Sequence, residues 1–112
     1  MHLPEFTFIE QTKNLVVVNI TLDKNARAFD GHFPGHPVLP GVVQLDWVMQ
    51  LAHMFFAVEP VAKDFQVKFT DMITTGSITL RIEFEPELNR LSFNYSKEDK
   101  TCSSGKVKLG KL

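Results

Sequence analysis

The sequence predicts an α+β fold in which an antiparallel sheet of about six strands wraps around one long central helix. Two observations predict it: one long helical pattern lies between residues 41 and 57, and stretches with strand character precede and follow it. The chain has 112 residues, a length typical of one domain, so residues 1–112 are assigned to a single domain.

Two strands are expected before the helix. Residues 6–9 form a short apolar stretch, and the run LVVVNITL at 15–22 is rich in the β-branched residues that strands favour. Residues 23–40 contain Asp, Asn and three prolines, and this composition predicts a structured loop.

The helix is expected to begin at Gly41 and to end near Ala57, with Pro60 just beyond it, where proline is common. Apolar residues occupy nearly every side of it, and Trp47 is the largest of them. Such a helix must be covered on most sides, which a sheet curved around it does economically.

The remainder of the chain predicts strands in which apolar and polar residues alternate. The expected strands are 65–69, 78–84, 91–95 and a last one ending at 107–109, separated by turns at 75–76, 86–89 and 96–100. A curved antiparallel sheet around one helix is the hot-dog fold, whose usual unit is a dimer with the two sheets joined edge to edge. Such joining also removes exposed strand edges.

Composition narrows the function classes. Hydrophobic residues make up 44% of the chain and ten residues are Phe, more than one small sheet buries, so a homodimer or higher homo-oligomer is expected. The formal net charge of −1 shows none of the excess positive charge that is typical of nucleic-acid-binding domains. The apolar segment 42–58 is broken by polar residues and is predicted to be a buried helix, with no membrane span.

The N-terminal residues and the number of cysteines indicate the cellular compartment of the protein. The first ten residues lack the basic and apolar regions of a signal peptide. The single cysteine, Cys102, cannot form a disulfide within the chain, which fits a reducing compartment and a cytoplasmic location. Cys102 lies in the polar segment KTCSSG, which we interpret as a turn without a catalytic role.

Residues 29–52 hold the candidate site. His32 is followed by closely spaced prolines and glycines, which stiffen the loop and would hold an imidazole in a defined place. Asp46 follows fourteen residues later on the helix, so a base and an acid could act together in proton transfer. His36 is interpreted as a loop residue, and the histidine spacing shows no compact metal-binding pattern.

Asp46, Gln50 and His53 follow the spacing i, i+4, i+7 and therefore share one stripe of the helix. This stripe faces either solvent or a polar cavity. If Asp46 is buried, desolvation favours its neutral, proton-donating form. Gln50 could orient that carboxyl by a hydrogen bond, and His53 is interpreted as a structural group.

Gly41 stands at the expected helix start, where the first amides are unpaired donors at the positive end of the helix dipole. A glycine there lets a substrate carbonyl come close to the backbone. It also permits a turn, and the two interpretations are compatible.

The segment GHFPGHPVLPG, followed by a helix that carries an acid, resembles the β-hydroxyacyl-[acyl-carrier-protein] dehydratases of fatty acid synthesis. Their motif runs close to HFPGxPxxPGVxxxE, and the match extends from His32 to Asp46, with Asp in place of Glu. The helix start LPGVVQLDWVM and the segment SSGK at 103–106 make the chain most similar to the ApeI-like dehydratases encoded with aryl-polyene clusters.

The resemblance implies a hot-dog fold and a dimer in which the histidine of one chain faces the acid of the other. It implies His32 as general base and Asp46 as the acid for the leaving hydroxyl. The Gly41 amide would polarise the thioester carbonyl, and Gln50 would support the acid. The remaining residues predicted to bind substrate are Phe33, Pro40 and Val42.

The implied reaction is dehydration of a β-hydroxyacyl thioester to the trans-2-enoyl thioester, without a metal or redox cofactor. The acyl chain would arrive on the phosphopantetheine arm of an acyl carrier protein, the expected partner. Two alternatives remain, a hot-dog acyl thioesterase and a non-catalytic acyl-binding subunit that completes a partner's site. The HFPG loop argues against the first, and the presence of both His32 and Asp46 argues against the second.

Overall fold

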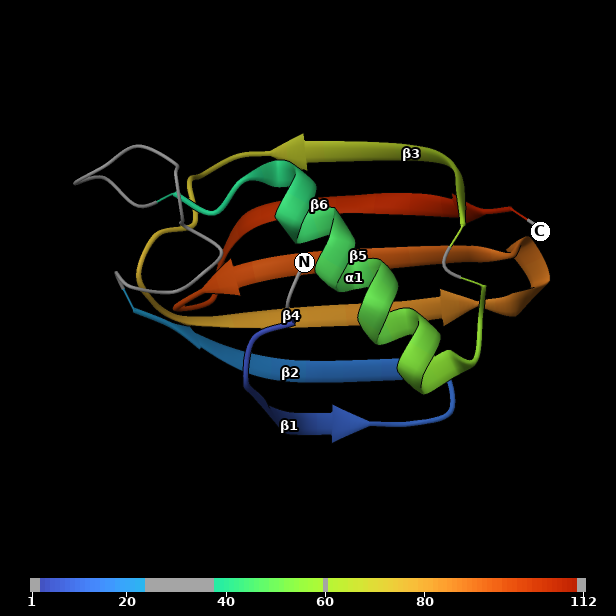
Figure 1. Cartoon of the computed structure of the whole chain (residues 1–112), viewed down its shortest axis with the longest axis horizontal. Coiled ribbons are helices and arrows are strands. Elements are labelled where there is room, and N and C mark those ends of the chain that lie inside the picture. Colours follow the sequence, from blue (N-terminus) through green and yellow to red (C-terminus); the bar gives the residue numbers. More distant parts are fainter. Residues whose placement is uncertain (1–2, 24–37, 60, 111–112) are drawn as a thin grey trace.

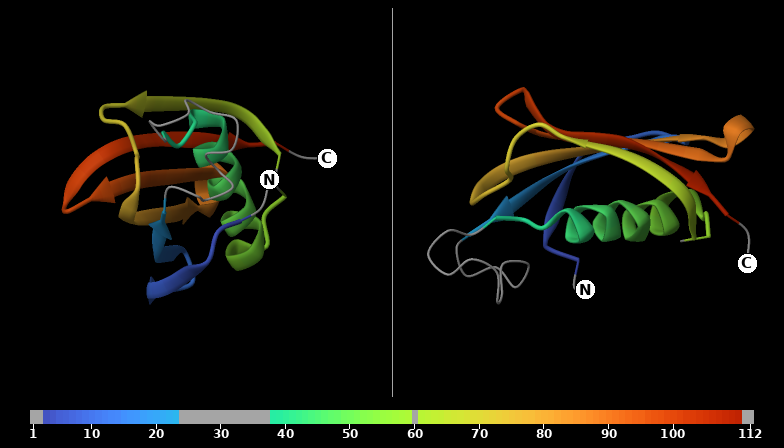
Figure 2. Two further views of the ribbon diagram at one scale, coloured as in Figure 1. Left: turned by 60° about the vertical axis from the view of Figure 1, so that its left-hand side comes forward. Right: turned by 90° about the horizontal axis from the view of Figure 1, so that it is seen from above.

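The computed structural model describes residues 3–23, 38–59 and 61–110, which form one curved antiparallel sheet and one α-helix on its concave side (Figures 1 and 2). The elements in chain order are β1 (Phe6–Gln11), β2 (Leu15–Leu22), α1 (Gly41–Phe56), β3 (Ala62–Phe69), β4 (Gly76–Glu85), the short 3-10 helix η2 (Pro86–Leu88), β5 (Arg90–Lys97) and β6 (Lys100–Leu109). The sheet order is β1-β2-β4-β5-β6-β3, so the strand that follows the helix lies at the far edge, beside the last strand. The predicted α+β fold with six strands and one helix is confirmed.

The core lies between α1 and the sheet, because each contributes one apolar face. The helix buries Val43, Trp47, Val48 and Leu51, and the alternate residues of the central strands point toward it. In β4 the buried positions are Ile78, Leu80 and Ile82, the alternation that the sequence predicts. Fully burying one such aliphatic side chain contributes about 1.5–3 kcal/mol.

The helix is covered on one side only within the single chain. Val42 and Met54 are 67% and 56% exposed, although the sequence predicts cover on most sides. Its C-terminal end is closed by Ala57 in the left-handed conformation, with φ 54°. In the described part of the chain no helix is long and apolar enough to span a membrane, and α1 has 16 residues.

The prediction for the last hairpin is wrong at one point. The turn comprises only Glu98 and Asp99, both with positive φ, and β6 already begins at Lys100. A two-residue turn with positive φ at both positions matches the twist of the flanking strands. The segment KTCSSG is therefore part of β6, and Cys102 is 3% exposed within the core.

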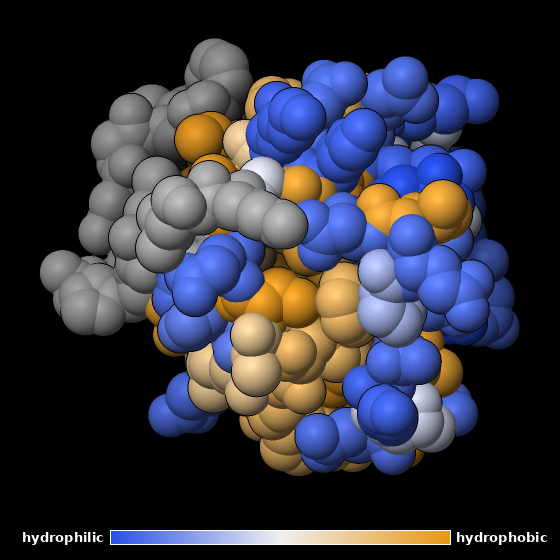
Figure 3. All heavy atoms as spheres, turned by 90° about the vertical axis from the view of Figure 1, so that its right-hand side faces the viewer, coloured by the Kyte–Doolittle hydropathy of each residue, from blue (hydrophilic) through white to orange (hydrophobic). Residues whose placement is uncertain are grey.

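Both edges of the sheet carry exposed apolar side chains. At the β3 edge, Phe65 and Phe69 are each 55% exposed, and Phe69 lies beside the first residue of the helix. At the β1 edge, Phe8 is 52% exposed and packs edge-on against Phe55 at the end of the helix. Figure 3 shows an apolar patch on the side of the molecule where α1 ends and β1 turns into β2.

Candidate active site

The structure describes part of the predicted site. Pro40, Gly41, Val42, Asp46 and Gln50 lie in α1 or directly before it. The predicted base His32 lies outside the described residues, together with Phe33 and His36. The pairing of His32 with Asp46 therefore stays a prediction.

Asp46 is held by the residue one turn further along the helix. The Gln50 Nε2 donates to Asp46 Oδ2 at 2.7 Å, and both side chains are half-buried in the single chain. A hydrogen bond is directional, so this contact fixes the orientation of the carboxyl. The predicted contact between the two side chains is confirmed.

His53, the third member of the stripe, has a different position. It is exposed, and its Nδ1 lies 2.8 Å from the carbonyl oxygen of Val58, just beyond the helix. This contact stabilises the end of α1, as expected for a structural group.

The helix begins at Gly41, and the preceding Pro40 is its N-cap, in an extended conformation with φ −63° and ψ 147°. No side chain caps this end, and the first turn contains no acidic residue. The first amides of an α-helix have no acceptor within the helix, and the dipole is positive there. This end of α1 is therefore suited to a carbonyl oxygen that gains negative charge.

A pocket of about 570 Å³ opens at the same end of the helix. It is lined mainly by apolar residues from the segment before α1, the start of α1, the end of β3 and the loop that follows β3: Val38, Leu39, Pro40, Gly41, Gln44, Phe69, Thr70, Asp71, Met72 and Ile73. Such a pocket is suited to a narrow, largely apolar ligand.

Gly41 has a packing role that the sequence does not reveal. A Cβ at this position would lie 2.7 Å from Cζ of Phe69. The residue is helical and does not have positive φ, so the turn itself does not require glycine. Any larger residue here would displace the Phe69 ring, which lies against the backbone at the mouth of the pocket.

Gln44 was missed by sequence reasoning. It is only 3% exposed, and it is bonded on three sides, to Leu39, Ser103 and Tyr95. The sequence does contain one signal for it: Gln44 is a polar residue between Val43 and Leu45 and lies off the stripe of Asp46. A polar residue on an apolar helix face is expected to be buried with hydrogen-bond partners.

The hydroxyl of Tyr95 donates to the Gln44 carbonyl at 2.7 Å. Burial raises the pKa of Tyr95 well above its ordinary value, and the negative charge of Asp46 adds to this rise. Tyr95 is therefore a neutral donor below the helix, close enough to Asp46 to sense its charge.

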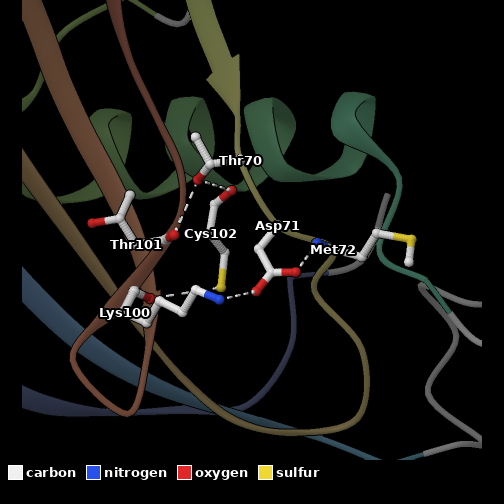
Figure 4. Close-up of polar contacts among 6 residues, drawn as sticks. All are labelled: Thr70, Asp71, Met72, Lys100, Thr101 and Cys102. Atoms are coloured by element: carbon white, nitrogen blue, oxygen red, sulfur yellow. Dashed lines mark hydrogen bonds and ion pairs between the residues drawn. The ribbon is translucent and has the colours of Figure 1, made fainter.

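The loop that lines the pocket is fastened to β6 (Figure 4). The Cys102 carbonyl accepts from the backbone amides of Thr70 and Asp71 at 2.9 and 3.0 Å, and from the Thr70 hydroxyl at 3.1 Å. Lys100 Nζ lies 3.2 Å from Asp71 Oδ2, and this contact lowers the pKa of Asp71.

The buried position of Cys102 also bears on its chemistry. Burial raises the pKa of its thiol, and Sγ lies 3.7 Å from the Lys100 carbonyl oxygen. A buried, protonated thiol is a poor nucleophile, which agrees with the absence of a predicted catalytic role. Within the described ranges, no three His, Cys, Asp or Glu side chains are placed to hold one metal ion.

Comparisons with known proteins define the class. The ApeI-like family model, described as ApeI dehydratase, matches residues 9–106. The structure of the dehydratase heterocomplex ApeI:P from Xenorhabdus doucetiae contains a chain with TM-score 0.84 and 31% identity, covering 96% of this chain and 99% of that one. The chain belongs to the ApeI-like dehydratase family.

Two further proteins are similar to this chain, one in sequence and one in fold. The 3-hydroxyacyl-[acyl-carrier-protein] dehydratase FabZ of Lactococcus lactis is 30% identical over 88 residues, 69% of this chain and 54% of that protein. The chain thus spans about half the length of the curated relatives it matches. A thioesterase from Pseudomonas aeruginosa has TM-score 0.64 at 15% identity, covering 91% of this chain and 77% of that one, so the likeness is one of fold alone.

Proposed function

We propose that the protein dehydrates a β-hydroxyacyl thioester to the trans-2-enoyl thioester. One observation carries the proposal. In a chain of the ApeI-like family, the Asp46 carboxyl is fixed by Gln50 on the helix whose first turn opens onto an apolar pocket.

In the proposed reaction His32 removes the α-proton, and the electron pair forms the new double bond. The bond from the β-carbon to the hydroxyl breaks, and Asp46 supplies the proton that makes the departing group water. The Gly41 amide stabilises the negative charge that develops on the thioester carbonyl. The atoms and electrons of this reaction balance without a metal or redox cofactor.

Substrate would be delivered by an acyl carrier protein, in fatty acid or aryl-polyene type biosynthesis. The pocket supports this, because a narrow, apolar acyl chain suits the mainly apolar lining around Pro40 and Phe69. Phe33 and Val42 complete the proposed substrate contacts. The single cysteine supports a reducing, cytoplasmic setting.

We further propose that the active unit is a homodimer joined through the β3 edge. In support, β3 has no neighbour on its outer side among the residues that the structure describes, and seven of its eight residues are exposed. Exposed Phe65 and Val42 would be covered by a second copy. Sedimentation that finds active monomers at micromolar concentration would contradict this assembly.

The ApeI:P heterocomplex favours one second candidate. In this alternative the chain pairs with a different subunit and completes that subunit's site. Asp46 and Gln50 are both in place here, which supports a catalytic chain.

The test is incubation with β-hydroxyacyl and enoyl thioesters of varied chain length, followed by mass spectrometry. A dehydratase interconverts the two and leaves the thioester intact. A thioesterase releases a free thiol. A completing subunit shows no turnover alone and gains it only with its partner.

A further inference from the structure

The first turn of α1 is fastened to the sheet by one buried side chain. We propose that Gln44 is a positioning residue, which holds the Gly41 amide at the place where the thioester carbonyl binds. The inference rests on the proposed dehydration and adds a residue to it.

Both polar groups of the Gln44 side chain are used. Nε2 donates to the Leu39 carbonyl at 3.1 Å, and Oε1 accepts from the Ser103 hydroxyl at 2.6 Å. Ser103 is fully buried on β6, and Gln44 is 3% exposed. One amide thus links the segment before the helix to the sheet, and an unpaired group in this position would be strongly unfavourable.

The backbone of the same residue is held as well. Its carbonyl accepts from the Tyr95 hydroxyl at 2.7 Å, and Tyr95 belongs to β5. Residue 44 is therefore located by two neighbouring strands at once, and it cannot slide along the helix axis without breaking directional bonds.

The geometry transmits this placement to Gly41. The Pro40 carbonyl and the Gly41 N–H belong to one planar peptide and point in opposite directions. The carbonyl accepts from the amides of Val43 and Gln44, both at 3.1 Å, so it points into the helix. The Gly41 N–H therefore points out of the helix end, where Gly41 lines the pocket.

Leu39 completes the arrangement. Its N–H donates to the Ile73 carbonyl at 2.7 Å, and its own carbonyl accepts from Gln44. The direction of the Gly41 amide is set by the helix, and its location relative to the sheet and the pocket is set by Gln44. An error of about 1 Å in such a donor can cost about a hundredfold in rate.

A purely structural role for Gln44 makes a different prediction. It would lower the stability of the fold and leave kcat and KM of the folded enzyme unchanged. A positioning role lowers kcat with little change in KM, since the amide contributes mainly when charge develops on the carbonyl.

The experiment compares Gln44→Met, which keeps the length of the side chain and removes both of its hydrogen bonds, with Gln11→Met at the exposed end of β1. The assay is thioester dehydration below the melting temperature of each variant. We expect kcat of Gln44→Met to fall about 10- to 100-fold with KM within about twofold. The Gly41 amide signal in the NMR spectrum should move, and Gln11→Met should match the wild type in both measurements.

A second pair covers the case in which Gln44→Met does not fold. Ser103→Thr and Ser103→Val have the same shape and differ in the hydroxyl that bonds Gln44. The valine variant should lose kcat relative to the threonine variant. Equal kcat in this pair, or wild-type kcat in Gln44→Met, would overturn the proposal.

Failure of the proposed function is recognised separately, because the wild type would then show no dehydration. The NMR comparison still decides the placement in that case. A displaced Gly41 signal in Gln44→Met supports positioning by Gln44, and an unchanged signal refutes it.

Discussion

The two ends of α1 are fixed to the sheet by different kinds of contact. At the N-terminal end, directional hydrogen bonds join Gln44 to Ser103 and Tyr95. At the C-terminal end the contacts are between aromatic rings. The Phe55 ring packs edge-on against the Phe8 ring, with the ring centroids 5.2 Å apart. Hydrogen bonds define a position closely, whereas apolar contact tolerates small shifts. The end that requires positional accuracy is the one that opens onto the pocket.

The largest expected effect is on the chemistry at the N-terminal half of the helix. Asp46→Asn should lower turnover by about 10²–10⁴, the usual scale of general acid–base catalysis, and His32→Ala should do the same. Asn keeps an oxygen that accepts from Gln50, so circular dichroism should show an intact fold. Asp99→Asn, in the exposed turn between β5 and β6, serves as control. Near-normal dehydration by Asp46→Asn would remove the acid role from this residue.

Gly41→Ala should impair both stability and rate. The added methyl would lie 2.7 Å from Cζ of Phe69, so either the ring or the helix start must move. Because Phe69 is 55% exposed and its ring can turn away, the loss of unfolding free energy should stay at or below about 1 kcal/mol, the lower limit for overpacked cores. Chemical denaturation of Gly41→Ala and of the double variant with Phe69→Leu checks the cause. If the second change recovers no stability, the ring is not what requires glycine.

Phe55→Ala tests the other end of the helix. Two edge-on aromatic contacts, with Phe6 and Phe8, are lost, and such pairs contribute about 0.5–1.5 kcal/mol each. We expect a lower melting temperature and a kcat close to that of the wild type below it. A loss of kcat as large as that of Gln44→Met would abolish the distinction between the two ends.

Cys102→Ser should have a small effect of the same type. The hydroxyl replaces a buried thiol, which costs about 1–2 kcal/mol of stability, while turnover of the folded enzyme stays within about twofold. Comparison with Cys102→Ala separates the loss of volume from the burial of a hydroxyl. A melting temperature of Cys102→Ser equal to that of the wild type would argue against the buried position.

The smallest expected effect concerns acid stability at the loop that lines the pocket. Lys100 lowers the pKa of Asp71 from its ordinary 3.8, so the pair stabilises the fold above that pH. This contribution is lost as the pH falls through the lowered pKa. The melting temperatures of wild type and Lys100→Met should therefore differ slightly at neutral pH and converge in acid. Lys13→Met, at an exposed turn, should show no such convergence.

The sequence predicts most of the fold because alternation in strands and the 3.6-residue period of the helix are local signals. The Asp46–Gln50 contact is local too, since the two residues are one turn apart. The start of β6 was missed because Glu98–Asp99 forms a two-residue turn without the glycine that usually marks one. Gln44 was missed because its partners come from β5 and β6, more than fifty residues further along the chain.

The strand order has a consequence for folding during synthesis. β3 follows the helix directly in the chain, whereas its neighbour in the sheet is the last strand, β6. Ala62, for example, pairs with Leu109. Contacts between residues so far apart in sequence form late, because a long loop must close first. Until β6 emerges from the ribosome, both edges of β3 are unpaired and Phe65 and Phe69 lack their neighbours on β6. That interval is when the nascent chain is most prone to wrong association.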